Sequence, residues 1–596
     1  MNDAVAGTPV WRARRSEPKR RADRRLVATA LWSTALAAVL LWPLRRGGYG
    51  LGHDMVFTPK QPLDLDSLGV GTSSPRAVPL DALVAAAERV VDGSLVGRFV
   101  LAAPLLAAGL GVVVLLRPRS VTAALVAGGG ATWNPFVVER LALGQWALLW
   151  CYAALAWIAV AVTRARGWPG RAYLVLAVAV ASVTPTGGLI AALAAIVAGL
   201  GNRRSGRGSR RDVVWTSAIA IVAQLPWIVP AALSTATATS DPAGAAAFAS
   251  RGEHPGGVLL TLLGGGGIWN ADVTPASRSG VLPWAGLALL GAAAVFGWRP
   301  LVDRLTPPVA RALSLTAAAG LFLALASALP GSDSVMRVVV GDLPGGGLLR
   351  DGQKFVMPVV VLECLLAGAA VDRAVSRART VQWRIVAGLA ASLIPVLLLP
   401  DAAATIRPTI EPVHYPADWK AVARIMRAEG GDAAVLPFTS YRAFEWAPGR
   451  VVLDPAPRLL PVPVVVNDEL AVSGHVVRGE DLRARRIGRV LEGGGGLPQG
   501  LAAAGIRWVV LEGGTPGVVA DLSGLLAVYN GADVALFEVP GQIAGLKTRT
   551  RTVALVILAD VLAGMMLLSA LGSLTCARVR FVAIMLVATR RRRLGG

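Results

Sequence analysis

The sequence predicts a mainly α-helical, polytopic membrane protein with about twelve spans and a small α/β domain before the last span. Three observations predict this class. Hydrophobic residues make up 54% of the 596 residues, and the mean hydropathy of +0.58 exceeds that of ordinary soluble domains. Apolar runs long enough to cross a bilayer recur along the chain. Arginine and lysine are concentrated in the short segments between these runs.

The basic clusters predict the orientation of the spans. Clusters such as Arg203/Arg204/Arg207 and Arg590–Arg593 lie between or after apolar runs, and short loops rich in Arg and Lys stay in the cytoplasm. The formal net charge of +22 is therefore interpreted as a topology signal, with both chain ends in the cytoplasm. Because the basic residues are scattered between spans, we expect no nucleic-acid partner.

Four regions are expected along the chain. Residues 1–25 form a basic cytoplasmic tail, and residues 26–400 form a transmembrane domain of about eleven spans. Residues 401–549 form an extracytoplasmic α/β domain, and residues 550–596 hold the final span and a second basic tail. The outer loops expected in the transmembrane domain are 45–98, 234–280 and 330–354.

The stretch 172–200 decides the number of spans. One long span would place the next basic cluster outside, whereas two short spans that turn at Thr184–Gly188 keep it inside. Pro and Gly favour the turn. The short apolar segment 581–588 is expected at the membrane interface. The other expected spans are 26–44, 99–116, 121–133, 146–162, 213–233, 281–297, 313–329, 356–371, 385–399 and 553–571.

Residues 401–549 mix helical and strand patterns. A helix is expected from Asp418 to Arg427, and apolar runs bounded by Gly and Asp predict buried strands at 433–438, 507–511 and 533–539. This order predicts a small α/β domain.

The first expected outer loop contains the segment Gly52–Lys60. Its Asp54 lies close to the membrane surface, where a carboxylate can accept a proton from a hydroxyl group. His53 and Lys60 lie in the same segment. The alternative interpretation is an aspartate that caps a turn in a solvated loop.

A second candidate segment runs from Asn134 to Gln145. Glu139 and Arg140 lie beside a span, where charged side chains need partners or a wet cavity. Asn-Pro breaks the helix before them. A structural helix break with a local ion pair is the alternative.

A third segment, Arg350–Phe355, precedes an expected span. Arg350 and Lys354 are four residues apart, so they share a face if the segment is helical. With Asp351 between them, two cations at the outer boundary suit a phosphate group. Ordinary anchoring at the interface is the alternative.

Glu363 lies inside an apolar span, and is interpreted either as a proton relay or as a neutral, hydrogen-bonded side chain. No metal site is expected from the histidines, which are dispersed. A divalent ion between Asp54 and either Asp342 or Asp272 is left open as a cofactor. The histidines are His53, His254, His414 and His475.

The chain resembles the GT-C superfamily of polytopic glycosyltransferases, in particular its actinobacterial arabinofuranosyltransferase-like and YfhO-like members. The resemblance rests on Asp54, the segment Asn134–Gln145, the motif Arg350–Phe355 and the α/β domain. It implies Asp54 as general base on an acceptor hydroxyl, and Arg350 and Lys354 as ligands of the donor phosphate. The further substrate-binding candidates are His53, Lys60, Glu139, Arg140, Gln145 and Asp351.

The resemblance also implies the substrates and the location. The donor is a sugar on a polyprenyl phosphate, the acceptor is a cell-envelope glycan or glycolipid, and transfer inverts the anomeric centre. The enzyme would lie in the plasma membrane with its active face outside. The aromatic residues of the outer domain fit either a core or a surface for stacking on sugar rings. These residues are Trp419, Tyr441, Phe444 and Trp446.

Three alternatives remain open at this point. A flippase or transporter of lipid-linked sugars often has two related halves with matching broken helices, whereas the hairpin at Pro185 has no counterpart in the sequence. A non-catalytic envelope-assembly protein with a degenerate GT-C fold is the second alternative, because Asp54 has no acidic neighbour. A polysaccharide polymerase is the third.

Overall fold

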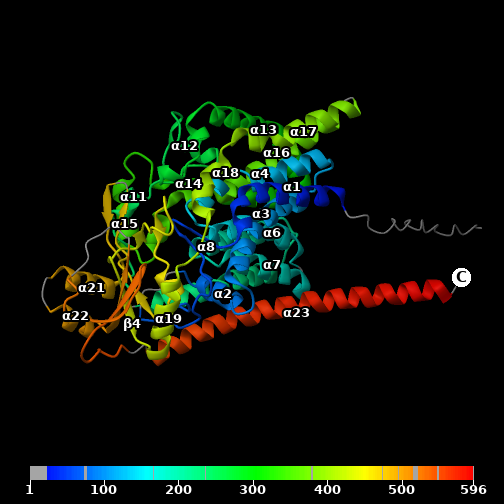
Figure 1. Ribbon diagram of the computed structural model, residues 1–596. Helices are drawn as coiled ribbons and strands as arrows, with labels where there is room; N and C mark the ends of the chain where they lie inside the picture. Colours follow the sequence, from blue (N-terminus) through cyan, green and yellow to red (C-terminus); the bar gives the residue numbers. More distant parts are fainter. Residues whose placement is uncertain are drawn as a thin grey trace, which may run out of the picture.

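The computed structural model describes residues 23–72, 77–165, 167–234, 236–377, 380–472, 474–493, 496–513, 521–546 and 549–594. Nearly all of the expected basic tail at 1–25 lies outside these residues. The described chain is mainly helical, and a smaller part containing β-strands lies at one end of a helical bundle (Figure 1).

Within the residues that the structure describes, eight helices are long and apolar enough to cross a membrane, or up to ten if each of two bent helix pairs is one span. The protein is therefore a multi-pass membrane protein. The expected spans 213–233 and 385–399 belong to the bent pairs, with bends of 50° and 52°. The helices of the bundle are α1 (Arg24–Leu40), α3 (Gly93–Leu116), α4 (Val121–Thr132), α5 (Pro135–Ala142), α6 (Ala147–Arg164), α7 (Gly167–Ala181), α8 (Pro185–Arg204), α9 (Arg210–Val222), α10 (Leu225–Leu233), α13 (Leu282–Leu305), α14 (Pro307–Ala326), α16 (Met357–Arg377), α17 (Val381–Leu398), α18 (Ala402–Ile410) and α23 (Thr550–Leu594).

Capping residues explain where several of these helices begin. Asp92, Ser120 and Asn134 accept backbone hydrogen bonds at the first turns of α3, α4 and α5. Thr184 does the same for α8, so the stretch 172–200 is divided into α7 and α8 next to the expected turn. Residues 581–588 continue α23 as one helix beyond the candidate span Thr550–Cys576.

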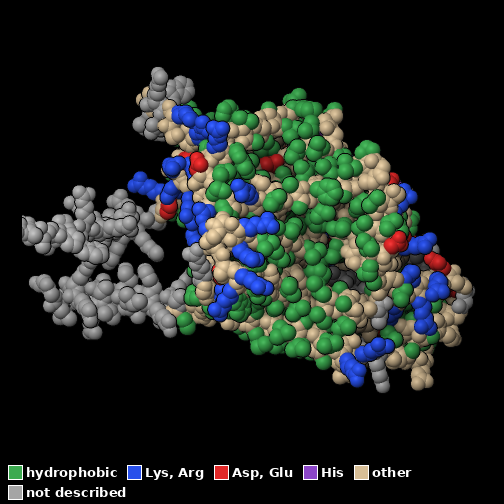
Figure 2. Space-filling view, turned by 180° about the vertical axis from the view of Figure 1, so that it is seen from behind, with side chains coloured by type: hydrophobic (Ala, Val, Ile, Leu, Met, Phe, Trp, Pro, Cys, Tyr) green, Lys and Arg blue, Asp and Glu red, His purple; other side chains and the backbone are tan. Residues whose placement is uncertain are grey.

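The space-filling view in Figure 2 shows a broad hydrophobic belt between two ends that carry Lys and Arg. Many side chains of this belt are large and exposed, as expected for helices that face lipid. On α13, for example, Leu289, Val295 and Phe296 are exposed.

The three predicted strands of the α/β domain, which are β4, β10 and β12, lie in one mixed sheet of five strands in the order β11-β12-β10-β4-β7, and the sequence analysis missed β7 and β11. β10 and β4 are parallel, as are β4 and β7, whereas β12 runs antiparallel to both β10 and β11. Helix α19 (Ala417–Glu429) packs in the cluster on one face of the sheet, and α21 (Leu482–Glu492) and α22 (Leu497–Ala503) pack on the other. The strands are β4 (Asp432–Leu436), β7 (Val464–Val465), β10 (Ile506–Glu512), β11 (Leu526–Asn530) and β12 (Val534–Glu538).

Smaller strands connect this domain to the loop after α1. β1 (Tyr49–Gly52) pairs with β2 (Met55–Val56) and also with β3 (Pro412–Val413), across more than 350 residues of sequence. β5 (Tyr441–Arg442) pairs with β6 (Val452–Leu453), and His53 bridges to Val452. The loop that carries Asp54 is therefore shared between the bundle and the α/β domain.

Candidate functional site

Asp54 lies in the tight hairpin between β1 and β2. Its backbone N–H donates to the carbonyl of Leu143, in the turn between α5 and α6, at 3.0 Å. Gly144 in that turn has a φ of +82°, and a side chain there would collide with the backbone of Met55. The glycine therefore lets the two turns touch, which brings the first loop onto the second candidate segment.

Both carboxylate oxygens of Asp54 accept hydrogen bonds. Gln145 Nε2 donates to Oδ2 at 2.8 Å, and the hydroxyl of Tyr441 donates to Oδ1. Burial and then the charge of Asp54 raise the pKa of Tyr441 well above its ordinary value, so the phenol stays protonated as the donor. The carboxylate is thus fixed by one residue from the bundle and one from the α/β domain.

Arg140 connects this carboxylate to the third candidate segment. Its side chain is completely buried and donates to both oxygens of Asp351, at 2.9 and 3.1 Å. It also donates to the side-chain carbonyls of Gln145 and Gln353. An unbroken chain of polar contacts therefore runs from Asp54 through Gln145 and Arg140 to Asp351.

Lys354 ends this chain, with its Nζ 3.4 Å from Asp351 Oδ2. Burial raises the pKa of Asp351, but the charges of Arg140 and Lys354 outweigh burial and hold the pKa at about 2. Asp351 is therefore ionised at neutral pH. Its one negative charge faces two cations, and Asp54 carries the second negative charge at the far end of the network, so the Lys354 end is the one that can face an anionic ligand.

Asp54, Gln145 and Lys354 line one cavity of about 370 Å³. Trp146 lines it as well and packs against Phe57, with ring centroids 5.3 Å apart. The turn between α7 and α8 contributes Val183–Thr186 to the wall. This volume suits a small polar group such as one or two sugar rings.

An ion pair between the two parts of the protein also lines the cavity. Arg458 Nε lies 3.2 Å from Asp81, which belongs to α2 (Leu80–Ala87). Sequence reasoning missed both residues, because neither stands in a motif. Tyr441 was considered only as an aromatic, and no signal in the sequence marked its hydroxyl as a partner of Asp54.

Arg350 and Lys354 do not lie on one continuous helix, which was the condition for the shared face expected from the sequence. Asp351 has φ −93° and ψ 88°, which breaks the helix between η4 (Gly346–Leu349) and η5 (Gly352–Val356). Arg350 consequently lies over the ring of Phe248, at 4.9 Å, and 3.8 Å from Glu480. It is not among the residues that line the cavity.

The remaining candidates lie around the cavity without lining it. His53 forms backbone hydrogen bonds to Val451 and Leu453, and burial lowers the pKa of its imidazole, which favours the neutral form. Lys60 is exposed. Glu139 is completely buried and accepts a hydrogen bond from Gln353 at 3.2 Å.

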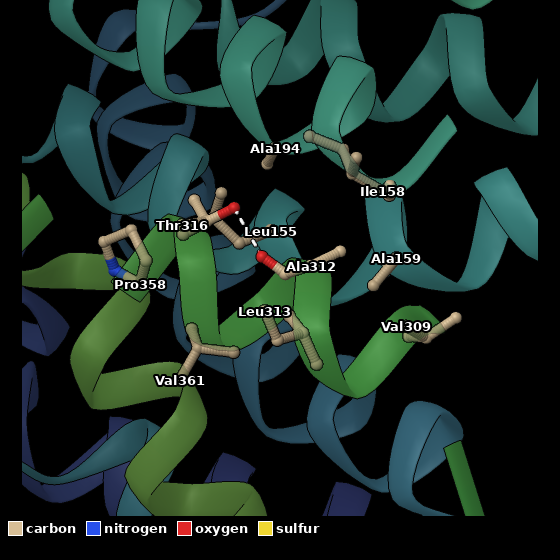
Figure 3. A pocket seen from close by; sticks show the side chains of 11 residues that line it. Leu155, Ile158, Ala159, Ala194, Val309, Ala312, Leu313, Thr316, Pro358 and Val361 are labelled. Atoms are coloured by element: carbon tan, nitrogen blue, oxygen red, sulfur yellow. Dashed lines mark hydrogen bonds between the residues drawn. The ribbon is translucent and has the colours of Figure 1, made fainter. Parts of the chain in front are cut away.

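A second cavity of about 550 Å³ lies among α4, α13, α16 and α17. Its lining is mainly apolar and includes Glu363 and Arg278, which pairs with Glu253 at 2.7 Å. A third space, shown in Figure 3 between helices that include α6 and α14, is about 20 Å³ and has room for about one water molecule. This third space is a gap in packing.

Within the described ranges, no group of three or more His, Cys, Asp or Glu side chains is placed to hold a metal ion. Gln145 and Tyr441 already occupy one acceptor position on each oxygen of Asp54. Each oxygen therefore keeps a further lone pair.

A polar cavity built where membrane helices meet a small α/β domain defines a polytopic membrane protein with its site at one end of the bundle. Neither a family model nor a curated protein matches the sequence. The chain is similar to the solved structure of the arabinofuranosyltransferase AftD from mycobacteria, with a TM-score of 0.53 and 16% identity over 88% of this chain.

A mutant form of AftD gives a TM-score of 0.51, again with 16% identity over 88% of this chain. The chain covers only 40% and 42% of these two structures. At this identity the likeness shows the fold alone, and this chain shares the fold of the matched part of the AftD structures.

Proposed function

We propose that this protein is a membrane glycosyltransferase that moves a sugar from a polyprenyl-phosphate donor to a cell-envelope glycan or glycolipid. The observation that carries the proposal is that Asp54 and Lys354 line one cavity and are joined through Gln145, Arg140 and Asp351. A base and a cation at fixed positions are what transfer from a phosphate leaving group needs.

In the proposed reaction, the acceptor hydroxyl attacks the anomeric carbon of the donor sugar. Asp54 accepts the hydroxyl proton while the new C–O bond forms. The bond from the anomeric carbon to the phosphate oxygen breaks, and the polyprenyl phosphate leaves with the electron pair beside the Lys354 ammonium. A single displacement of this kind inverts the anomeric centre.

The remaining candidates have supporting roles in this proposal. Arg140 and Gln145 orient Asp54 and Asp351, and Asp351 orients Lys354. His53, Lys60, Glu139 and Arg350 do not line the cavity, and we assign them no contact with the reacting groups. Helix α8 begins at the cavity with Pro185 and Thr186 and ends at the basic cluster of Arg203 and Arg204, which supports an extracytoplasmic active face in the plasma membrane.

A lipid-linked-sugar flippase is a second candidate, favoured by the large apolar cavity among α4, α13, α16 and α17. Three arginines line this cavity, namely Arg278 and, near the end of α16, Arg373 and Arg377. Glu363, earlier in α16, lines it as well. Such a path would relocate a labelled lipid without forming a glycosidic bond.

The test uses membranes containing the full-length protein, supplied with polyprenyl-phosphate sugars and envelope acceptors. Asp54→Asn should lower transfer by a factor on the order of 10²–10⁴, while the protein remains folded. Asp333→Asn is the matched control, because Asp333 is exposed, 66%, and pairs only loosely with Arg337. Wild-type transfer by Asp54→Asn would refute the base assignment, and movement of label without transfer would favour the flippase.

A further inference from the structure

The Asp54 carboxylate receives its two side-chain hydrogen bonds from different parts of the protein. Gln145 comes from the junction of α5 and α6, whereas Tyr441 comes from β5 of the α/β domain. Tyr441 does not line the cavity, so its hydroxyl touches the carboxylate from behind. Tyr441 therefore supports the Asp54 side chain and does not itself face the cavity.

One strand sets the positions of both Tyr441 and the Asp54 hairpin. On one side, β6 pairs with β5, so that Leu453 lies opposite Tyr441. On the other side, the N–H of Leu453 donates to the carbonyl of His53 at 2.7 Å, and the N–H of His53 donates to Val451 at 2.8 Å. The backbone of β6 therefore aligns both His53, which precedes Asp54, and Tyr441, which donates a hydrogen bond to Asp54.

Further contacts hold the loop around Asp54 against the same domain. The hydroxyl of Tyr415 donates to the carbonyl of Phe57 at 3.0 Å, and Thr58 donates to the carbonyl of Arg458 at 3.1 Å. Arg450 donates to the carbonyl of Leu51 at 2.9 Å. These contacts fix the loop on both sides of the hairpin.

β5 is itself anchored in the domain interior. Arg442, next to Tyr441, is completely buried, with its Nε 3.0 Å from Asp454 and 2.8 Å from Glu512. Because neighbouring side chains of a strand point to opposite sides, Arg442 holds the strand while Tyr441 reaches towards Asp54.

We propose that Tyr441 is a positioning residue of the Asp54 site, and that the α/β domain thereby completes the active site. This inference rests on the proposed function. With one hydrogen bond on each oxygen, the carboxylate cannot rotate freely, and its remaining lone pairs are held towards the cavity. A hydroxyl that enters the cavity then meets a base in one orientation.

The experiment measures transfer kinetics of the full-length protein with polyprenyl-phosphate sugar. Tyr441→Phe removes the hydroxyl and keeps the ring, and should lower kcat by a factor on the order of ten to one hundred. The KM for the donor should change by less than about threefold, because the lost contact acts on the chemical step.

The matched control is Tyr529→Phe in the same domain. The hydroxyl of Tyr529 donates to Asp418 Oδ1 at 2.7 Å, so this variant also loses a tyrosine–aspartate hydrogen bond, away from the cavity. Its kcat should equal that of the wild type. An equal fall in both variants would mean that Tyr441 acts only through domain stability, and would overturn the proposal.

A second measurement does not depend on transfer. The melting temperatures of Asp54→Asn, Tyr441→Phe and the double variant should be non-additive, because both single changes disrupt one contact. If Asp54→Asn is inactive while Tyr441→Phe is fully active, the positioning role is overturned and the proposed function stands. Fully active Asp54→Asn overturns the proposed function, and additive melting shifts would then overturn the contact as well.

Discussion

Arg140 in the bundle and Arg442 in the α/β domain are both completely buried beside carboxylates, yet their surroundings differ. Arg442 faces Asp454 and Glu512 in a closed core. Burial, and then the charge of Asp454, raise the pKa of Glu512 well above its ordinary value, so this cluster becomes neutral by keeping a proton. It has no charge left for a ligand.

The cluster around Arg140 keeps its charges. Asp351 has a pKa of about 2, and Lys354 adds a second cation beside it. The cluster also reaches a cavity through Gln145 and Lys354. The comparison teaches that a buried arginine marks a functional site only where its network stays ionised and opens to a space for a ligand.

The sharpest way to break this comparison is to replace both arginines by lysine. At position 140, lysine keeps the charge but loses the forked contact with Asp351 and the contacts with Gln145 and Gln353. Arg140→Lys should therefore lower kcat/KM for transfer by a factor on the order of one hundred. The measurement is transfer in membranes, beside the melting temperature of each purified variant.

Arg442→Lys should mainly lower the melting temperature, since its partners are sealed from the cavity. Because Arg442 anchors β5, its effect on transfer should not exceed that of Tyr441→Phe. A larger loss of transfer in Arg442→Lys than in Arg140→Lys would reverse the assignment of the two clusters.

Glu88 provides a third case for the same comparison, because it is a buried carboxylate with no cation among the causes of its pKa shift. Glu88 lies beyond α2 and accepts a hydrogen bond from the N–H of Gln61 at 2.5 Å. Burial raises its pKa to about 7. Between about pH 4.3 and 7 the folded protein therefore holds a proton that the unfolded chain releases, so this residue makes stability fall as pH rises through that window.

Glu88→Gln should remove this loss of stability at high pH. The variant should be more stable than the wild type by about 2–3 kcal/mol at pH 8, and the difference should vanish near pH 4.5. Melting curves of both proteins at these pH values measure it. An equal difference at the two pH values would show that Glu88 is not protonated in the folded protein.

The smallest expected effect is a difference in the KM for the donor between variants of Lys354 and of Arg350, the two cations of the third candidate segment. Lys354→Met should raise the KM for the donor by a factor on the order of ten, since a charge-assisted contact with phosphate is lost. Arg350→Met should change it by less than about threefold, because Arg350 is partly exposed and pairs with Glu480. Donor titrations of both variants measure this, and a stronger effect in Arg350→Met would restore the shared face expected from the sequence.

The sequence by itself determined the membrane class, the position of most helices and three strands of the α/β domain, namely β4, β10 and β12. These features depend on local patterns, namely apolar runs, helix caps such as Thr184, and strands bounded by Gly and Asp. It also singled out the segments of Asp54, Arg140 and Lys354, since charged groups beside spans require partners.

Only the tertiary structure decided which of these residues meet. The backbone break at Asp351 separates Arg350, at the end of η4, from Lys354 in η5, and no periodicity in the sequence marks that break. Tyr441 reaches Asp54 across 387 residues because β6 pairs with β5 and with the Asp54 hairpin. Contacts of this kind depend on how strands from distant segments align, and local composition carries no record of that alignment.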